Sequence, residues 1–261
     1  MHVVLPKRLH TFWATCIEVK KSPGPGAFFV GRNPNVAAGQ IIILNGAPRS
    51  GKSSIAAAIQ DMFDGVWINF GVDACAQITP PRLRPGIGLR PGGERPDLEA
   101  LVPRIYAALY DSIAAHSRLA LNVVTDVGHH DAYSRPLDIL SDCARRLAGL
   151  PVLFVGVRCP IEVILQRRSA SGADGAYVSG SVGDPVPLPV RRWQEEVHRP
   201  GIYDLEVDTS RQNPAECAGA IRHRLEAGPE PLAFRKLAQM RARDKDGNQR
   251  SPMPRLPGWK T

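Results

Sequence analysis

One segment of the sequence has the residue types and the spacing of a phosphate-binding loop. It fits the pattern G-x-x-x-x-G-K-[ST] and consists of Gly46, Ala47, Pro48, Arg49, Ser50, Gly51, Lys52 and Ser53. The glycines let the backbone turn so that successive N–H groups point inward, where they can hold phosphate oxygens. Lys52 would reach the β- and γ-phosphates, and the Ser53 hydroxyl would bind Mg²⁺. The motif predicts a nucleoside triphosphate site formed by this loop and the adjoining Ser54.

The segments on either side of the loop supply the context that the motif needs. Residues 40–45 (QIIILN) form a β-branched run typical of a buried strand. Residues 52–63 place Ile55, Ile59 and Met62 at helical spacing, so a helix would add its positive N-terminal dipole to the phosphate site. The motif by itself leaves kinases, hydrolysing switches, motors and binding modules open.

Asp73 is the candidate base for a phosphoryl acceptor. It follows a second predicted strand (66–70), beyond the carboxyl end of a strand next to the loop, where open α/β sheets bind ligands. A carboxylate there would orient or deprotonate an acceptor hydroxyl. The same residue type would also serve as the cap of a following helix, and spacing alone favours neither role.

A second acid, Asp126, closes the hydrophobic run 119–125. An acid at the end of a strand beside the loop would hold Mg²⁺ through water, together with Ser53. The alternative is an ordinary turn residue at a strand end. His129 and His130 follow closely. Adjacent residues of extended chain face opposite ways, and we expect both histidines at the surface.

Arg167 and Arg168 end a predicted helix over 160–168 and adjoin a Gly- and Pro-rich stretch, 171–189. A cation-bearing lid over about 169–191 would neutralise a transferring phosphoryl group and exclude water. Arginines at the C-terminus of a helix also interact favourably with the helix dipole. For at least one of these two arginines, this structural role is an equal alternative to a role in the lid.

Short apolar runs alternate with helical patterns throughout the body of the chain. Further strands are predicted at 119–125, 152–157 and 204–207, and further helices at 98–116, 134–147, near 190–197 and after Asn213. The last helix has a clear start, with Asn213 as its cap and Glu216 three residues later. This order predicts an α/β fold of the P-loop NTPase type, with a five-stranded parallel sheet and helices on both faces.

Composition excludes several classes of protein and sets the expected boundaries. The chain has 261 residues and no apolar stretch long enough for a membrane span, and charged residues interrupt its first twenty. The five cysteines form no CxxC pair, which favours reduced thiols in a cytoplasmic protein over a disulfide or zinc framework. We expect a basic, irregular extension over 1–39, one domain over 40–228 and a basic, Pro-rich, disordered tail over 229–261.

The net charge of +8 comes from the two ends of the chain. Residues 1–39 carry five Lys and Arg against one Glu, and residues 234–261 carry eight against two Asp, whereas the body between them is slightly acidic. A basic, Pro-rich end is usually a solvated segment. The distribution therefore argues against nucleic acid as a partner of the body of the chain.

Several segments in this order resemble the chloramphenicol phosphotransferase-like family of P-loop small-molecule kinases. They are IIILNG at 41–46 with GKSS at 51–54, FGVD at 70–73, VGVRC at 155–159, VH at 197–198 and YDLEVDT at 203–209. The resemblance covers about 40–227. It implies ATP-dependent phosphorylation of a hydroxyl group on a small molecule, which in the namesake activity is chloramphenicol. It also assigns the acceptor-activating base to Asp73, the lid arginine to Arg167 and the Mg²⁺-binding acid to Asp126.

The sequence departs from the family pattern in the lid. The family has a second arginine group there, whereas residues 169–174 (SASGAD) contain no basic residue. Cationic help would then come from Arg168, Arg191 or Arg192. A kinase of another acceptor, such as a sugar or nucleotide, remains an alternative, as does a non-catalytic nucleotide-binding module whose basic ends hold nucleic acid or a partner.

Overall fold

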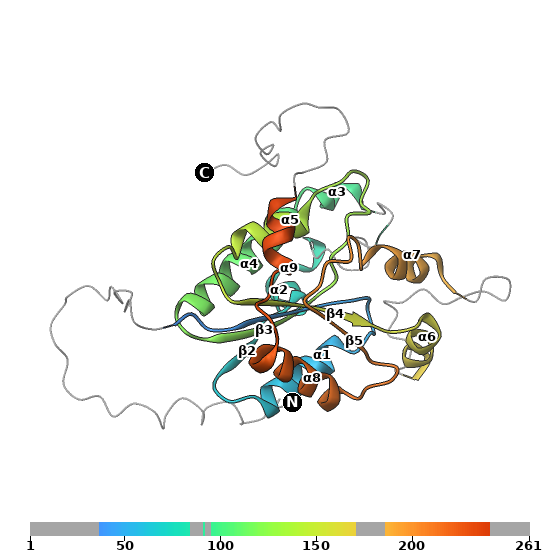
Figure 1. Ribbon diagram of the computed structural model, residues 1–261. Coiled ribbons are helices and arrows are strands. Elements are labelled where there is room, and N and C mark those ends of the chain that lie inside the picture. The colour runs from blue at the N-terminus through green and yellow to red at the C-terminus, as the bar shows by residue number, and fades with distance from the viewer. Residues whose placement is uncertain (1–36, 84–90, 92–94, 171–185, 241–261) are drawn as a thin grey trace, which may run out of the picture. The chain divides into compact units, whose positions relative to one another are not determined.

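A single parallel sheet organises the computed structural model, which describes residues 37–83, 91, 95–170 and 186–240 (Figure 1). Its strands lie in the order β2-β3-β1-β4-β5, which confirms the predicted five-stranded parallel sheet. They are β1 (Ile41–Asn45), β2 (Trp67–Asn69), β3 (Asn122–Val127), β4 (Val152–Arg158) and β5 (Leu205–Asp208). The strand that leads into the phosphate loop is central, so the loop lies beside the carboxyl ends of β3 and β4.

Helices cover both faces of the sheet. On one face lie α1 (Lys52–Met62) and α8 (Pro214–Ala227), and on the other α4 (Val102–Arg118), α5 (Ile139–Arg146) and α9 (Ala233–Gln239) (Figure 1). The other described elements are α2 (Val72–Ile78), a 3₁₀ turn (Pro81–Leu83), α3 (Pro96–Glu99), α6 (Ile161–Ala170) and α7 (Leu188–Glu196). Within the described ranges, no helix is both long and apolar enough to span a bilayer.

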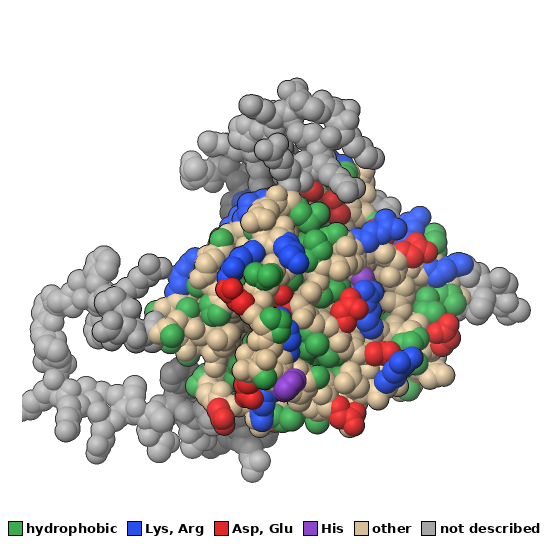
Figure 2. Space-filling model, viewed as in Figure 1, with side chains coloured by type: hydrophobic (Ala, Val, Ile, Leu, Met, Phe, Trp, Pro, Cys, Tyr) green, Lys and Arg blue, Asp and Glu red, His purple; other side chains and the backbone are tan. Residues whose placement is uncertain are grey.

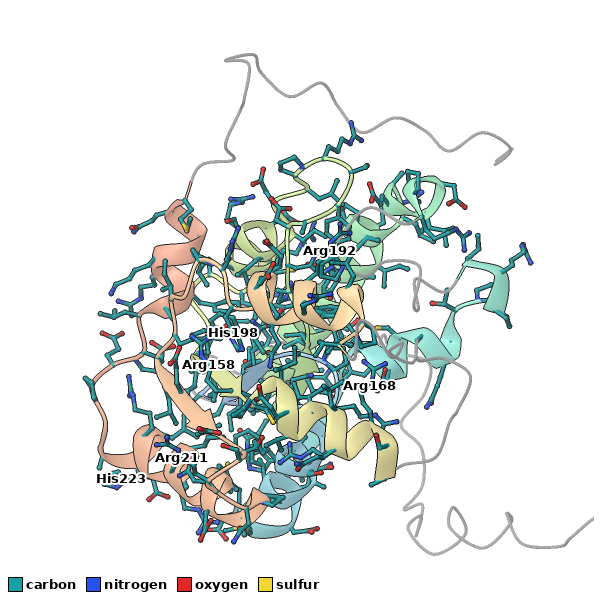
Figure 3. All side chains as sticks on the ribbon, turned by 90° about the vertical axis from the view of Figure 1, so that its right-hand side faces the viewer. Arg158, Arg168, Arg192, His198, Arg211 and His223 are labelled. Atoms are coloured by element: carbon teal, nitrogen blue, oxygen red, sulfur yellow. The ribbon has the colours of Figure 1, made fainter. Side chains whose placement is uncertain are left out.

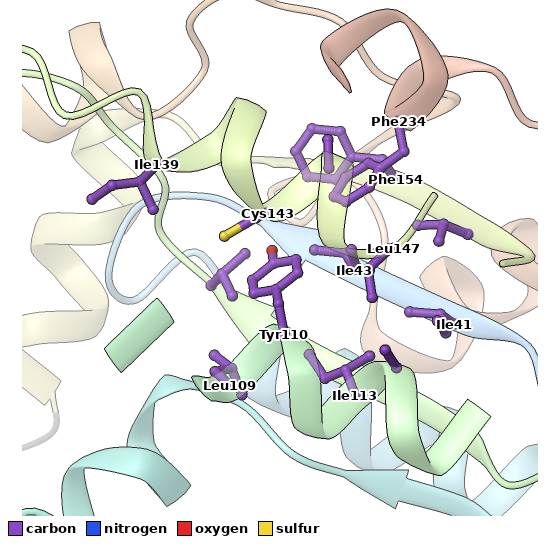
Figure 4. Packing of buried hydrophobic residues seen from close by; sticks show 14 of the residues in the cluster. Ile41, Ile43, Leu109, Tyr110, Ile113, Ile139, Cys143, Leu147, Phe154 and Phe234 are labelled. Carbon is purple, nitrogen blue, oxygen red and sulfur yellow. The ribbon is translucent and has the colours of Figure 1, made fainter. Parts of the chain in front are cut away.

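The alternation of side chains along β1 explains why helices are needed on both faces. Ile41 and Ile43 pack with α4, α5 and α9, whereas Ile42 and Leu44 pack with α1 and α8, and all four are fully buried. Figure 4 shows the first of these clusters, in which Tyr110 lies near aliphatic side chains and Phe154 lies beside Phe234. A strand buried on both faces reads as a continuous hydrophobic run, as β1 does.

The predicted helix boundaries are correct at α8 and wrong at two other places. Asn213 and Glu216 form the expected reciprocal cap of α8. The predicted helix 98–116 is divided into α3 and α4, because Pro103 has no N–H to continue the first helix and instead opens the second. The predicted helix 134–147 begins only at Ile139, after a loop held by hydrogen bonds from two backbone N–H groups to Asp131.

The sequence predicts that the domain ends at residue 228, but the structure shows that it continues beyond this residue. Residues 233–239 form α9, in which Ala233, Phe234 and Leu237 are buried. The ring of Phe234 stacks on Tyr110 at 6.4 Å and meets Phe154 edge-on at 5.0 Å. A seven-residue helix is too short for its periodicity to stand out from a basic, Pro-rich background. Of the predicted extension over 1–39 and the predicted tail over 229–261, residues 1–36 and 241–261 lie outside the described residues.

Figure 2 shows that Lys and Arg side chains are interspersed with Asp and Glu on the face in view. Several of these charges pair across elements, as Arg146 of α5 does with Asp111 of α4 at 2.7 Å and Arg158 of β4 with Glu206 of β5 at 2.7 Å. Mixed charge of this kind is ordinary for a solvated surface.

Candidate active site

A cavity of about 940 Å³ opens at the carboxyl ends of β1 and β3. It brings together the side chains that the sequence singled out for chemistry: Lys52, Ser53, Asp73, Asp126 and Arg167. The phosphate loop forms one wall, with Ser50 buried behind it. The cavity also receives residues from α2, α4, α6, α7 and the segment after β5, so it is assembled from most of the chain's connections.

The phosphate loop has the strained backbone that its glycine pattern predicts. Gly51 has a φ of 93° and caps α1 without a side chain, and Arg49 also has a positive φ, 66°. At Gly46 the backbone passes so close to β4 that a Cβ atom would lie 2.5 Å from the Val157 carbonyl oxygen. Lys52 Nζ donates to the carbonyl oxygens of Gly46 and Ala47, both at 2.9 Å. The loop is thus closed around its own lysine.

Burial lowers the pKa of Lys52 to about 8, although Asp126 and then Asp73 act in the opposite direction. Phosphate binding needs the ammonium form, so we expect the affinity for ATP to fall as the pH rises through about 8. Bound phosphates raise the pKa again, and binding just above this pH therefore takes up a proton. Calorimetry in buffers of different ionisation enthalpy measures that uptake. If the wild type takes up no proton on binding ATP, or if the uptake persists in Lys52→Met, Lys52 is not the group that titrates on phosphate binding.

Ser53 and Asp126 form the expected pair for a metal ion. The Ser53 hydroxyl donates to Asp126 Oδ2 at 2.8 Å, at the start of α1 and near the end of β3. No cluster of three or more His, Cys, Asp or Glu side chains suited to a metal occurs among the described residues. A hydroxyl, one carboxylate, water and nucleotide phosphates are what Mg²⁺ requires, because it is rarely held by an all-protein cage. The residues present fit that ion.

Gly71 explains why a glycine precedes the candidate base in FGVD. A Cβ atom at this position would lie 1.9 Å from Asp126 Oδ1 and 2.9 Å from the Asp126 carbonyl oxygen. We therefore expect Gly71→Ala to displace the Asp126 carboxylate from Ser53, weakening Mg²⁺-dependent ATP binding and costing about 1–3 kcal/mol of stability. Thermal unfolding and calorimetry with Mg²⁺ and ATP measure both effects.

Gly219→Ala is the matched control for this change. Nothing lies within 4 Å of a Cβ atom at Gly219, in the middle of α8. Alanine in a helix interior is expected to add about 0.5–1 kcal/mol of stability, with ATP binding unchanged. If Gly71→Ala behaved like this control, the close packing of Gly71 on Asp126 would have no functional meaning.

Asp73 lies in the first turn of α2 and lines the cavity. The N-cap of α2 is Gly71, and no side chain makes a cap hydrogen bond there, so Asp73 is not the helix cap that the sequence allowed as an alternative. Its carboxylate is exposed to the cavity and close enough to Lys52 to act on the charge of that residue. This position suits a group that meets an acceptor beside the γ-phosphate.

Arg167 reaches the phosphate loop and is anchored to Thr209. Its guanidinium donates to the Thr209 hydroxyl at 3.0 Å, to the Thr209 carbonyl oxygen at 2.7 Å and to the Arg49 carbonyl oxygen at 3.3 Å. Arg168 also lines the cavity, whereas Arg191 and Arg192 are not among its lining residues. Figure 3 shows Arg168 on α6 and Arg192 on α7, on either side of the predicted lid. Residues 171–185 of that lid lie outside the described part.

His129 and His130 are buried, at 2% and 6% exposure, which corrects the expectation that they lie at the surface. They do face opposite ways. His129 Nε2 hydrogen-bonds the Tyr110 hydroxyl at 2.7 Å, and burial lowers the pKa of His129 to about 3. His130 lines the cavity, with Trp193 edge-on at 4.9 Å. The segment is buried because α4 and α7, distant in sequence, cover it.

The aromatic part of the cavity lining could not be predicted from the sequence. Tyr106, Tyr133, Trp193 and His130 line the cavity, together with aliphatic side chains of α2 and α4. Burial raises the pKa of both tyrosines, so their hydroxyls stay neutral donors. Tyr106 falls on the helical spacing of α4, where it is indistinguishable from a core residue. Only the packing shows that it faces a cavity.

Asn45 was also missed, although it stands in the recognised segment IIILNG. It is 1% exposed and its Nδ2 donates to the Val197 carbonyl oxygen at 2.7 Å and to the Tyr203 hydroxyl at 2.9 Å. Its Oδ1 accepts from the His129 backbone N–H at 2.8 Å. One side chain therefore joins the start of the phosphate loop to α7 and to the segment that carries His130. An asparagine at the end of a buried hydrophobic strand is the signal that could have revealed it, since a buried amide needs partners.

Comparison with known proteins shows the family to which the chain belongs. The profile of the family described as chloramphenicol phosphotransferase-like protein matches residues 39–226. Two proteins of Mycobacterium tuberculosis, from strains CDC 1551 and H37Rv, are each 28% identical over 210 residues, covering 76% of this chain and 88% of theirs; both have the provisional name O-phosphotransferase.

A solved structure, a provisionally assigned kinase from Chloroflexus aurantiacus, covers 74% of this chain and 99% of its own with a TM-score of 0.51. At 15% identity it shows the fold alone, which is that of a P-loop kinase. The family profile, by contrast, spans most of the chain and contains the phosphate loop, both acids and Arg167. The chain therefore belongs to the chloramphenicol phosphotransferase-like family and is a phosphotransferase built on the P-loop kinase fold.

Proposed function

We propose that this protein transfers the γ-phosphoryl group of ATP to a hydroxyl group of a small, largely apolar molecule, with chloramphenicol as the acceptor to test first. The observation that carries the proposal is one cavity lined by Lys52, Ser53 and Asp73 together with several aromatic rings. Phosphoryl transfer requires positioning and charge stabilisation, and these groups can supply both.

The phosphate end of the cavity supports nucleotide binding. The N–H groups of the loop and the start of α1 would hold the phosphates, and Lys52 would exchange its two carbonyl partners for phosphate oxygens. Mg²⁺ would be held by Ser53 and Asp126, and when bound it neutralises charge on the β- and γ-phosphates. Arg167 would add positive charge at the rim of the loop.

Asp73 would accept the proton of the acceptor hydroxyl as its oxygen attacks the γ-phosphorus. The bond between that phosphorus and the β–γ bridging oxygen of ATP breaks, so ADP leaves with its electron pair and the acceptor becomes a phosphate monoester. The exposed position of Asp73 in the cavity supports this role, because an acceptor that enters the cavity can reach the carboxylate.

The apolar part of the cavity lining supports an apolar, hydroxylated substrate. It consists of aromatic rings and of aliphatic side chains of α2 and α4, with neutral tyrosine hydroxyls as hydrogen-bond donors. Such a lining with few polar groups is typical of a site for an organic molecule with a flat or apolar body.

Acceptor-dependent release of ADP, followed in a coupled assay with ATP and Mg²⁺, tests this proposal. We expect chloramphenicol to stimulate ADP release well above the rate without acceptor, and simple sugars or nucleosides to do so much less. Stimulation by a sugar or nucleoside alone would keep the kinase reaction and replace the acceptor. ATP binding without stimulation by any acceptor would instead favour the non-catalytic nucleotide-binding module.

A further inference from the structure

The segment after β5 touches the phosphate loop at Ser50 through Thr209, a residue that also lines the cavity. The Thr209 hydroxyl donates to the Ser50 carbonyl oxygen at 2.7 Å and accepts from Arg167 Nη1 at 3.0 Å. A second acceptor, the Arg158 carbonyl oxygen, lies farther away at 3.4 Å. A hydroxyl has one proton to donate, and the shorter contact identifies Ser50 as its acceptor. The two partners of this bond are 159 residues apart in sequence.

This bond determines how one peptide group of the phosphate loop is oriented. The carbonyl of Ser50 and the N–H of Gly51 belong to the same planar trans peptide, so they point in opposite directions. With the Ser50 carbonyl oxygen held by Thr209, the Gly51 N–H points away from Thr209. Gly51 has a φ of 93°, and a glycine has more freedom to rotate this peptide than any other residue. An external constraint is therefore most useful here.

Arg167 and the Thr209 side chain complete the constraint. Two guanidinium N–H groups hold Thr209, one on its hydroxyl and one on its carbonyl oxygen. The Thr209 methyl group and Arg167 Nη1 also lie 3.4 and 3.5 Å from where a Cβ atom of Gly51 would be. One hydroxyl, one methyl group and one guanidinium thus support the loop at the Ser50–Gly51 peptide.

We infer that Thr209 is a positioning residue for nucleotide binding: its hydroxyl fixes the Ser50–Gly51 peptide so that the Gly51 N–H faces the phosphates. The inference rests on the proposed use of ATP and adds a residue outside the loop to the machinery that binds it. It also gives Arg167 a supporting function that does not depend on the lid.

The test compares Thr209→Val, which has the same shape without the hydroxyl, with Thr209→Ser, which keeps the hydroxyl. Calorimetric titration with Mg²⁺ and ATP is expected to show about tenfold weaker binding by Thr209→Val, equivalent to about 1.4 kcal/mol, and near wild-type binding by Thr209→Ser. The affinity of Thr209→Val for inorganic tripolyphosphate, which has no base, is measured by displacement of ATP. We expect it to fall in parallel with the affinity for ATP. Thermal unfolding without nucleotide separates this effect from a loss of folding.

Thr125→Val is the matched control. Thr125 is fully buried in β3, and within the described residues its hydroxyl has no hydrogen-bond partner, so the same change there should leave ATP binding unaltered. If Thr209→Val does not fold, the pair Thr209→Ser and Thr209→Ala gives the same comparison. Wild-type affinity without the hydroxyl, equal losses in the Ser and Val variants, or a loss for ATP but not tripolyphosphate would each overturn the inference. If wild-type protein binds no ATP, the proposed function itself fails.

Discussion

Replacement of Asp73 by Asn is expected to lower kcat for phosphoryl transfer by about 10²–10⁴-fold, the usual contribution of a general base. The amide has nearly the shape of the carboxylate but cannot accept the proton of the acceptor hydroxyl. Asp73 is exposed in the first turn of α2 and caps nothing, so the change should leave the fold intact. The Kd for ATP should also stay close to that of the wild type, because the phosphates are held by the loop.

Initial rates at saturating ATP and acceptor, with a separate titration of ATP, measure the two effects. Asp61→Asn is the matched control, since Asp61 is exposed on α1 and does not line the cavity. It removes the same charge from the same protein and should turn over normally. Wild-type turnover in Asp73→Asn would remove Asp73 from the mechanism, and a loss of ATP binding would make it a nucleotide ligand instead.

Replacement of Lys52 by Met is expected to lower kcat/KM for ATP by at least about 10²–10³-fold, the effect of removing one preorganised charge-stabilising donor. Met keeps the length of the apolar stem and removes the ammonium group that would follow the γ-phosphoryl group. The nucleotide-free protein should be no less stable, because burial already disfavours this charge, as the lowered pKa of Lys52 shows.

Kinetics and thermal unfolding with and without ATP distinguish these effects. Wild-type protein should be stabilised by Mg²⁺ and ATP, whereas Lys52→Met should lose most of that stabilisation. Lys236→Met, at an exposed position on α9, is the control for loss of a lysine charge. A Lys52→Met protein that bound and used ATP normally would contradict the assignment of the phosphate loop.

The features that the sequence predicted correctly are local. The hydrophobic run of β1, the phosphate loop and the start of α1 are contiguous, and each has its own residue signature. The cap of α8 is also decided within four residues, by Asn213 and Glu216. Local steric and hydrogen-bonding preferences determine such features, so a single sequence is enough to find them.

The features that the sequence could not predict depend on contacts between distant segments. His130 is buried because Trp193 of α7 lies against it, and Arg167 meets a partner, Thr209, that is 42 residues away. Helix α9 is held in place when the Asp204 carboxylate accepts from the backbone N–H groups of Leu232 and Ala233. Burial and pairing at these sites are products of tertiary packing, which overrides local propensity.

The Gly71 position combines both kinds of information. Its place in FGVD marks it as part of a motif, but the motif does not say what the glycine does. The structure supplies the reason, since Asp126 fills the space that a side chain would need. The candidate base and the candidate metal-binding acid are thus spatially linked through a residue that has no side chain.

Mass spectrometry of chloramphenicol after incubation with the purified protein, ATP and Mg²⁺ tests the central claim most directly. The account predicts one added phosphoryl group on a hydroxyl of the acceptor, formed by the wild type and by Asp61→Asn and absent with Asp73→Asn. Phosphorylated product at an equal rate in the Asp73→Asn reaction would contradict the assigned base. No phosphorylated product from chloramphenicol or from any hydroxylated compound tested, by a protein that binds ATP, would contradict the proposed reaction.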